Sequence, residues 1–358
     1  MPHAAVSVVM PVYNGERTLR AAADSILTQS FADFEFLIVD DASTDDTAAI
    51  LDGYARRDAR VRLLRQERRG PCLSAALRIG CAAAAGRFIA RMDADDVAFA
   101  DRLERQVRFL DEHPEIAVVG GALQYLGAGG PLPRFLRHPT SPEAVRDALQ
   151  EYNCIAHPTA VIRRDVYEAV GGFRRVFMHA EEYDLWLRIA ERHPLANLSD
   201  PVLYYRLHPG QISFAQIGEQ VIYTLGARAA ARRRRSGGAD PFEGREAITR
   251  ADLLTLGLTE SGIDAAIIDR YVTWGSFLAG LGALEDAQLL AAEMRRLPLA
   301  GAARRRLAAE ADWLSGKVSV RQGSLARGAA RLLRAVAARP GLAFALMRRL
   351  AGRPRSAA

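Results

Sequence analysis

Short apolar runs alternate with helical periodicity along the first third of the chain. Four of these runs have the length of buried strands and cover residues 6–13, 34–41, 61–65 and 87–93. Between and after them, apolar residues recur at the three- and four-residue spacing of one helix face, over residues 17–29, 72–86 and 101–110. This alternation predicts parallel βαβ units and a sheet that helices cover on both faces.

The pattern changes further along the chain. Residues 115–126 and 158–164 have the character of strands, whereas residues 181–193 show the spacing of an amphipathic helix. Two serines carry helix-start signals. Ser43 is a candidate N-cap with an acid three residues later, as in a capping box, and Ser141 precedes a proline at the first helical position.

The composition indicates where domains begin and end. A run of charge followed by glycines and a proline, at residues 232–241, is typical of a linker. From Ile248 onward the sequence is helical and rich in alanine and arginine. We therefore expect a first domain over residues 1–215, a helical segment with an Arg/Gly linker over 216–247, and a basic α-helical region over 248–358.

Charge is distributed unevenly. Residues 1–215 carry a net charge of −4 and residues 216–358 a net charge of +10, and no acidic residue follows Asp312. Lys317 is the one lysine, so lysine-centred covalent chemistry has almost no candidate. The basic half lacks the interleaved aromatic residues of a base-stacking surface, so no nucleic-acid partner is expected.

Three features favour a cytoplasmic protein. The sequence has no apolar run of membrane-spanning length, and its first residues lack the charged start and the length of a secretory signal. The sequence has three cysteines, Cys72, Cys81 and Cys154. Their odd number argues against a disulfide framework, and their spacing does not match that of a zinc cluster.

Acidic residues follow two of the predicted strands. The second strand ends in Asp40 and Asp41, and the fourth is followed by Asp93, Asp95 and Asp96. Ligands of open α/β sheets bind outside the carboxyl ends of the strands. Both clusters, with the loop that begins at Pro11, are therefore expected to line one crevice.

Asp93 and Asp95 point most directly to a metal. At a spacing of two residues in an extended segment, both carboxylates would point the same way. They repel each other unless a cation or a proton lies between them, and Mg²⁺ is usually held by one or two carboxylates together with substrate phosphates. Turn formation and helix capping are the alternative roles of strand-end aspartates, and both interpretations stay open at this point.

Two phosphate-binding motifs are missing from the sequence. It contains no GxxxxGK[ST], and no GxGxxG follows the first predicted strand. A P-loop nucleotidase and a dinucleotide oxidoreductase are therefore not expected, and phosphate would be held by a metal and arginine.

Five segments together resemble family 2 nucleotide-sugar glycosyltransferases of the GT-A fold. They follow one another in order at residues 6–19, 26–47, 86–103, 181–188 and 204–213. The resemblance implies an α/β GT-A fold, Rossmann-like, with a mostly parallel sheet between helices. The C-terminal α-helical region lies outside the resemblance.

The resemblance implies roles for the matching positions. The expected nucleotide-sugar-binding residues are Pro11, Tyr13, Asn14, Glu16, Asp41, Asp93 and Asp95. Asp93 and Asp95 match the DXD pair of the family, which implies a Mg²⁺ or Mn²⁺ cofactor with Asp95 as the more direct ligand. His208 matches a histidine that closes over the diphosphate or metal, and a loop histidine that faces solvent is the alternative.

The catalytic base matches a position where this chain departs from the family. The family usually has an Asp here, as the second acid of a pair, and this chain has Glu182 after Glu181. The resemblance implies that Glu182 deprotonates the acceptor hydroxyl. For Glu181 and Asp184, stabilisation of the first helical turn by acids is the alternative. Arg78, where family members often have Asn, is a second departure and puts a donor or acceptor contact in doubt.

The expected function is therefore an inverting, metal-dependent sugar transfer of the hexosyltransferase type. A nucleotide-sugar donor would glycosylate a glycan or lipid-linked acceptor in bacterial surface polysaccharide biosynthesis. A sugar nucleotidyltransferase and a catalytically degenerate scaffold are the alternatives.

The tail over residues 324–356 alternates arginines with apolar residues. Such a helix can lie on an anionic membrane surface, here the inner face of the cell membrane. A solvated face of a helical bundle is the other interpretation.

Overall fold

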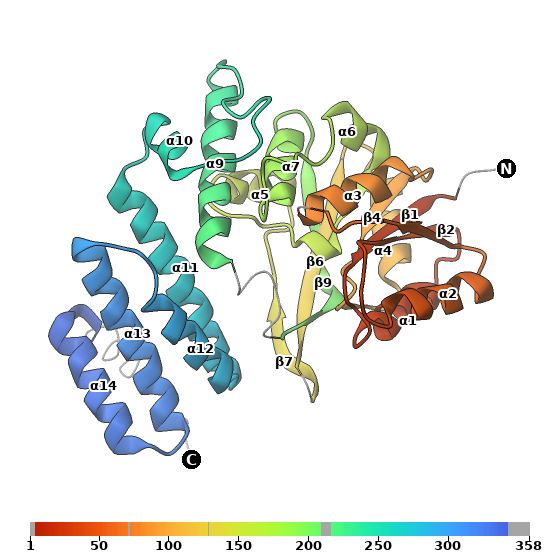
Figure 1. Ribbon diagram of the computed structural model, residues 1–358. Helices are drawn as coiled ribbons and strands as arrows, with labels where there is room; N and C mark the ends of the chain where they lie inside the picture. Colours follow the sequence, from red (N-terminus) through yellow and green to blue (C-terminus); the bar gives the residue numbers. More distant parts are fainter. Residues whose placement is uncertain (1–3, 71, 128, 209–215, 343–358) are drawn as a thin grey trace, which may run out of the picture. The chain divides into compact units, whose positions relative to one another are not determined.

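The structure is a computed structural model that describes residues 4–70, 72–127, 129–208 and 216–342 (Figure 1). The chain divides into two compact units. The first consists of Met1–His208 and Tyr223–Thr249, and the second of Pro209–Ile222 and Arg250–Ala358.

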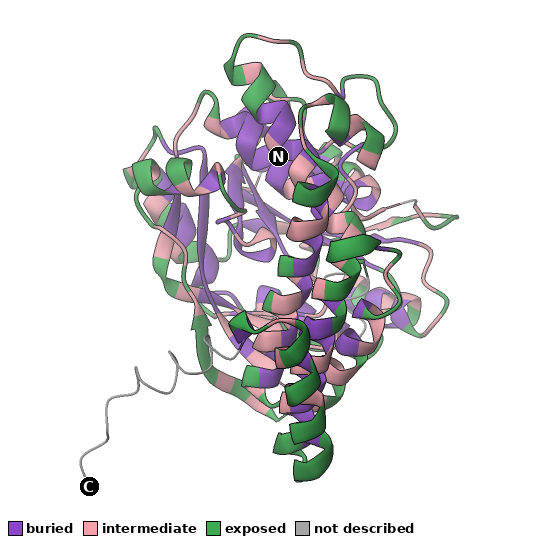
Figure 2. Ribbon diagram, turned by 90° about the vertical axis from the view of Figure 1, so that its left-hand side faces the viewer, coloured by how far each residue is buried: buried purple, intermediate pink, exposed green. Residues whose placement is uncertain are grey.

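The first unit is built on one sheet whose N-terminal half is parallel. Four strands pair side by side in the order β3-β2-β1-β4, and they are β1 (Val6–Val12), β2 (Phe34–Asp40), β3 (Val61–Arg65) and β4 (Phe88–Arg91). Three helices connect them, α1 (Leu19–Leu27), α2 (Thr47–Arg57) and α3 (Leu73–Ala82). Strand β1 is buried at every position, as the central strand of a covered sheet should be. Buried strands, in purple, stand out inside the molecule in Figure 2. The predicted βαβ units are confirmed.

The other half of the sheet is mixed. Beyond β4 the order continues β8-β6-β9-β5, with β7 paired to β6. These strands are β5 (Val97–Ala98), β6 (Val118–Gly127), β7 (Gly130–Leu136), β8 (Val161–Arg163) and β9 (Leu195–Arg206). Only β6 and β9 pair in parallel here, so the expected mostly parallel sheet describes the first four strands and not the complete sheet.

Helices and one short turn complete the first unit. They are α4 (Arg102–Glu112), α5 (Pro142–Leu149), the 3₁₀ turn η1 (His157–Thr159), α6 (Arg164–Ala169) and α7 (Glu181–Ala190). Helix α5 begins as predicted, because the Ser141 side chain accepts a hydrogen bond from the Ala144 N–H group. The strand expected at 158–164 is shorter, since its first residues form η1.

Several helix boundaries differ from the prediction by a few residues, and two of the differences have a structural reason. Ser43 is not an N-cap, because α2 begins only at Thr47, and the Ser43 hydroxyl instead accepts a hydrogen bond from the Asn14 N–H group (3.0 Å). The helix expected to reach Gly86 ends at Ala82. Gly86 instead lies close to the backbone of β1. A Cβ atom on this residue would lie 2.6 Å from the Ser7 backbone nitrogen, so a glycine is needed at this position.

The second unit is helical, as the sequence predicts for the C-terminal region. Its complete helices are α10 (Arg250–Thr255), α11 (Glu260–Leu281), α12 (Leu284–Met294), α13 (Gly301–Arg321) and α14 (Leu325–Ala338). Helix α9 (Ile217–Arg235) follows β9 and belongs to both units, since the first unit resumes at Tyr223. Glycines allow α13 and α14 to approach closely, since a Cβ atom at Gly316 would lie 3.1 Å from the Gly328 carbonyl oxygen. In the described part of the chain, no helix is long and apolar enough to span a membrane.

Candidate active site

The loops after β1 and β2 are joined by reciprocal hydrogen bonds. Asn14, which has a left-handed backbone (φ 50°), accepts a bond at Oδ1 from the Thr44 N–H group (2.8 Å) and donates its own N–H to the Ser43 hydroxyl (3.0 Å). The Glu16 carboxylate accepts a bond from the Asp46 N–H group (3.2 Å). Both side chains therefore bond to the neighbouring loop, at the carboxyl ends of the two strands.

Three further residues expected to bind the donor lie around these loops. Pro11 is a buried residue of β1, in register with Val39. Asp41 is buried and accepts a hydrogen bond from the Gly70 N–H group (2.7 Å). Tyr13 is 39% exposed, and the Arg69 guanidinium lies 3.9 Å from the centre of its ring. Tyr13 thus presents an aromatic surface to solvent at the end of β1.

A cavity of about 470 Å³ adjoins Asp41. Its lining comes from the loop after β2, the loop before α3, one side of α3 and the segment before α7. The lining residues are Asp41, Gln66, Gly70, Ala75, Ala76, Arg78, Ile79, Ala82 and Arg175. Arg78, which lines the cavity, donates a hydrogen bond to the Phe173 carbonyl oxygen (3.1 Å). The departure from the family at Arg78 therefore places a guanidinium beside the expected nucleoside site.

The acids after β4 form a turn. The Asp96 N–H group donates to the Asp93 carbonyl oxygen (3.4 Å), so the extended segment assumed for Asp93 and Asp95 is wrong. The turn nevertheless gathers the carboxylates, because one oxygen from each of the three aspartates lies within 4.8 Å of the others. Thr18, just before α1, holds the turn through a hydrogen bond to the Ala94 carbonyl oxygen (3.0 Å).

Strand β9 brings His208 to the same turn. His208 Nε2 lies 2.9 Å from Asp95 Oδ2. Two residues earlier, Arg206 donates from Nε to the Asp95 carbonyl oxygen (2.6 Å) and from its backbone to Asp96 Oδ1 (2.8 Å). Of the three expected metal ligands, Asp93 and Asp95 therefore lie together in the turn, and His208 reaches Asp95.

A divalent cation fits this group of side chains. Asp96 is fully buried, and its Oδ2 atom has no hydrogen-bond partner in the residues that the structure describes. Burial, together with the neighbouring charges of Asp95 and Asp93, raises the pKa of Asp96 well above its ordinary value. Carboxylate oxygens with one imidazole are ligands that Mg²⁺ and Mn²⁺ accept, and a cation would relieve the repulsion between these acids.

Arg91, at the end of β4, was not singled out from the sequence. Its side chain is buried, forms an ion pair with Asp93 and is close enough to Glu181 to be electrostatically coupled to it. The fully buried Arg102 donates a hydrogen bond to the Arg91 carbonyl oxygen (2.7 Å). The sequence does contain a signal for Arg91, because it is a charged residue in an otherwise apolar strand. A buried guanidinium needs acidic partners, so this position could have been identified as part of a site.

Glu181 and Glu182 form the first turn of α7. Glu182 accepts a hydrogen bond at Oε1 from the Asn153 side chain (3.1 Å), and its Oε2 lies 3.8 Å from Nδ1 of His157. Burial raises the pKa of Glu182 to about 7, and burial with the nearby Glu182 charge raises the pKa of Glu181 to about 8. The Glu182 side chain remains 19% exposed, so a ligand can reach it.

The neighbouring residues of α7 are structural. Asp184 is fully buried between Arg174 and Arg188, with which it forms ion pairs. The residues predicted to be core rather than a sugar-binding platform are completely buried, which confirms that prediction for Leu185, Trp186 and Ile189.

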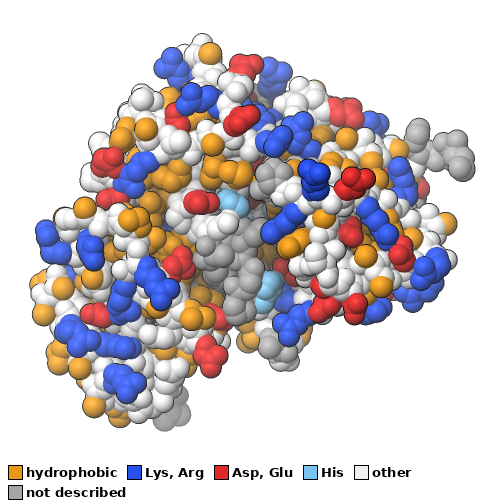
Figure 3. All heavy atoms as spheres, in the orientation of Figure 1, with side chains coloured by type: hydrophobic (Ala, Val, Ile, Leu, Met, Phe, Trp, Pro, Cys, Tyr) orange, Lys and Arg blue, Asp and Glu red, His pale blue; other side chains and the backbone are white. Residues whose placement is uncertain are grey.

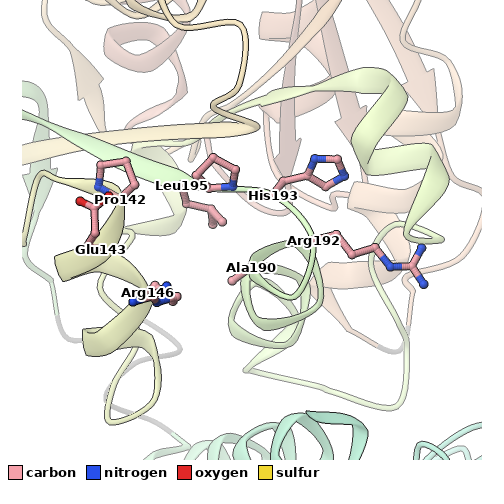
Figure 4. A pocket seen from close by; sticks show the side chains of 8 residues that line it. Pro142, Glu143, Arg146, Ala190, Arg192, His193 and Leu195 are labelled. Atoms are coloured by element: carbon pink, nitrogen blue, oxygen red, sulfur yellow. The ribbon is translucent and has the colours of Figure 1, made fainter. Parts of the chain in front are cut away.

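A second cavity of about 260 Å³ lies elsewhere in the first unit. Figure 4 shows its lining side chains, which come from α5, from the end of α7 and from the start of β9. The lining includes Arg146 and Arg192 but none of the expected site residues. We therefore place the candidate active site at the strand ends.

Comparisons with known proteins agree with this fold. Residues 7–171 match the model of a family described as glycosyl transferase family 2. The chain is 39% identical over 190 residues to the putative glycosyltransferase EpsE of Bacillus subtilis, covering 52% of this chain and 66% of that protein. It is 33% identical over 207 residues to the O-antigen biosynthesis glycosyltransferase WbnJ of Escherichia coli, covering 57% and 80%.

Another relative from Escherichia coli carries a more detailed name. It is the UDP-Glc:alpha-D-GlcNAc-diphosphoundecaprenol beta-1,3-glucosyltransferase WfgD, 30% identical over 211 residues, with 58% of this chain and 79% of that protein covered. Among solved structures, S. aureus TarS 1-349 in complex with UDP-GlcNAc aligns with a TM-score of 0.52 at 19% identity, covering 89% of this chain and 92% of that one. The predicted fold class is confirmed.

Replacing Arg91 by leucine is expected to lower the free energy of unfolding by about 3–5 kcal/mol, because it leaves buried acids without their counter-charge. Urea unfolding followed by circular dichroism measures the change. Arg87→Leu is the matched control at the other end of β4, where Arg87 forms an exposed ion pair with Asp111, and it should cost about 1 kcal/mol or less. Equal losses in the two variants would contradict the role given to Arg91.

Proposed function

The chain belongs to glycosyl transferase family 2 and is a glycosyltransferase, and on that basis we propose that it catalyses inverting, metal-dependent transfer from a nucleotide sugar. Family membership favours this activity over the sugar nucleotidyltransferase and scaffold interpretations. One observation carries the proposal. The buried Arg91 guanidinium forms an ion pair with Asp93, and its charge also acts on the base candidate Glu182, whose side chain is 19% exposed.

The nucleoside of the donor would occupy the region around Asp41. The adjoining cavity supplies a carboxylate, small apolar side chains and two guanidinium groups, from Arg78 and Arg175. Tyr13 offers an aromatic surface at the neighbouring strand end. This combination suits a base and ribose next to a negatively charged diphosphate.

Asp95, Asp93 and His208 would hold Mg²⁺ or Mn²⁺ beside the donor diphosphate. When bound, the metal would neutralise charge that develops on the leaving nucleoside diphosphate, an effect worth several kcal/mol. The ion pair between Arg91 and Asp93 and the hydrogen bonds from Arg206 hold these ligands in place.

Glu182 would act as the general base. The acceptor hydroxyl loses its proton to the Glu182 carboxylate while its oxygen bonds to the anomeric carbon, and the bond from that carbon to the diphosphate oxygen breaks. A base in position contributes about 10²–10⁴-fold, and it works best with a pKa near the working pH. Burial provides such a value for Glu182.

Replacing Glu182 by glutamine is expected to lower the rate of sugar transfer by about 10²–10⁴-fold, because an amide cannot accept the proton.

The pH dependence of the wild type gives a second prediction, because the base works only when deprotonated. Since the pKa of Glu182 is raised to about 7, the transfer rate should rise between about pH 6 and pH 8. Turnover of isotope-labelled donor measures both effects, with Glu168→Gln on the exposed side of α6 as the control. If Glu182→Gln transferred sugar at the wild-type rate, Glu182 would not be the general base.

Replacing Asp95 by alanine is expected to weaken Mn²⁺ binding by more than about 10-fold and to abolish transfer, because the metal loses its most direct ligand. Titration calorimetry measures Mn²⁺ affinity, and EDTA should stop transfer by the wild type. Asp200→Ala, at an exposed position of β9, should leave both properties unchanged. Transfer that survives EDTA and the loss of Asp95 would contradict metal dependence.

The acceptor is proposed to be a growing surface polysaccharide or its lipid-linked precursor. The names of WbnJ and WfgD, which refer to O-antigen biosynthesis and to a diphosphoundecaprenol acceptor, support this class. An acceptor of this kind lies at the inner face of the cell membrane, which suits a cytoplasmic enzyme that touches the bilayer peripherally.

Helix α14 has the composition of a bilayer contact. Leu325 and Leu333 are 65% and 71% exposed, and Arg327 and Arg334 are exposed on the same helix. Figure 3 shows Lys and Arg side chains over α13 and α14 on the face in view, as over the rest of that face. Basic residues near an anionic bilayer contribute about 1 kcal/mol each, and exposed leucines can enter its surface. We therefore propose an anionic membrane as the partner of this helix, over the alternative of a solvated helix face.

The full chain is expected to co-sediment with phosphatidylglycerol vesicles at low salt and to stay in solution with phosphatidylcholine vesicles. The double variant Leu325→Glu/Leu333→Glu should lose this binding, because it removes apolar contacts and adds negative charge. Leu289→Glu on α12, where the leucine is 64% exposed, is the control that should still bind. If the wild-type chain ignores anionic vesicles at low salt, the membrane contact is wrong.

A further inference from the structure

The Glu182 carboxylate is held from outside its own helix. In the part of the chain that the structure describes, one side-chain hydrogen bond reaches it, from Asn153 Nδ2 to Glu182 Oε1 (3.1 Å). Asn153 lies in the segment between α5 and η1, far from α7 in the sequence. The orientation of its amide is fixed, because Asn153 Oδ1 accepts a hydrogen bond from the Ile155 N–H group (3.3 Å).

The other oxygen of Glu182 faces a neutral group. Oε2 lies 3.8 Å from Nδ1 of His157, whose ring is packed beside the rings of Phe173 and Trp186. Burial and the nearby Arg91 charge lower the pKa of His157 well below its ordinary value, so the imidazole is uncharged at neutral pH. His157 therefore supplies no positive charge that would fix the carboxylate, and Asn153 is the group that orients it.

We propose that Asn153 is the positioning residue of the base: its amide fixes Glu182 Oε1 and stabilises the ionised carboxylate, leaving Oε2 to receive the acceptor proton. This inference rests on the proposed function of Glu182. In the step itself, the acceptor O–H bond breaks and its proton moves to Oε2. The acceptor oxygen bonds to the anomeric carbon as the bond to the diphosphate breaks.

A glutamate needs such a contact more than an aspartate does. Its additional methylene adds one rotatable bond, so the carboxylate can occupy more positions when nothing holds it. A displacement of about 1 Å can lower a rate by about 10²-fold. The Asn153 amide restricts this freedom at the position where the chain departs from the usual aspartate.

The charged groups around Glu182 set the direction of the expected pH effect. Glu181 precedes it on α7, His157 faces it from η1, and Arg91 and Asp93 act on it from the end of β4. Arg91 and the Asn153 hydrogen bond favour the ionised form, whereas burial and Asp93 oppose it. Removing the amide donor therefore raises the pKa of the base and moves the acidic limb of the rate profile to higher pH.

Two variants of Asn153 test the proposal through donor turnover measured from pH 5.5 to 9. Asn153→Ala is expected to lower kcat by about 10–100-fold, to change the donor KM by less than about twofold, and to move the acidic limb upward. Asn153→Asp keeps the shape and the acceptor for Ile155 N–H but places a second negative charge beside Oε1. It should move the limb further upward.

The aspartate variant separates positioning from a structural role. If Asn153 only shaped its own turn, Asn153→Asp would restore the wild-type kcat and pH profile, and that result would overturn the proposal. Tyr152→Ala, at the adjacent and 45% exposed residue, is the control expected to keep the wild-type profile. Thermal unfolding confirms that each variant is folded.

Glu182→Gln distinguishes the two levels of failure. Wild-type transfer by Glu182→Gln would remove the proposed base, and the role of Asn153 would go with it. If Glu182→Gln loses transfer while both Asn153 variants match the wild type in kcat and in pH profile, then the base stands and only the positioning role is wrong.

Discussion

The buried guanidinium of Arg91 is the interaction on which the site depends. It lies at the end of β4, forms an ion pair with Asp93 and acts on Glu181 and Asp96 from within the same region. Buried carboxylates in such numbers are costly unless a cation accompanies them. The Arg102 guanidinium donates a hydrogen bond to the Arg91 carbonyl oxygen and so stabilises the backbone at this position. The proposed metal ligands and the proposed base can therefore be close to each other because the Arg91 charge acts on both.

The two halves of the sheet contribute different parts of the site. The parallel half ends in the loops of Asn14 and Asp41 and in the turn at Asp93. The mixed half supplies β9, which brings His208 to Asp95, while α7 presents Glu182. A sheet of parallel strands alone would supply only the proposed nucleotide-binding residues. The added strands complete it with groups from distant parts of the sequence.

Sequence periodicity predicted the first four strands and the acids at their ends, since carboxyl ends of parallel strands meet at one edge. It did not predict how Ser43 and Asn153 are used. The local pattern at Ser43 resembles a capping box, but Asn14 from another loop takes its hydroxyl. Asn153 bonds to Glu182 across 29 residues of sequence, and no local pattern encodes that contact. Arg91 did leave a signal, as a charge in an apolar strand.

The reciprocal bonds between the loops of Asn14 and Thr44 have a thermodynamic consequence. Backbone that is already ordered loses little conformational entropy when a ligand arrives. The strained left-handed backbone of Asn14 is maintained by the neighbouring loop rather than by a bound nucleotide. Donor association at these strand ends should then resemble the docking of two rigid surfaces, with the heat of binding reporting contacts made and water released rather than the folding of a loop.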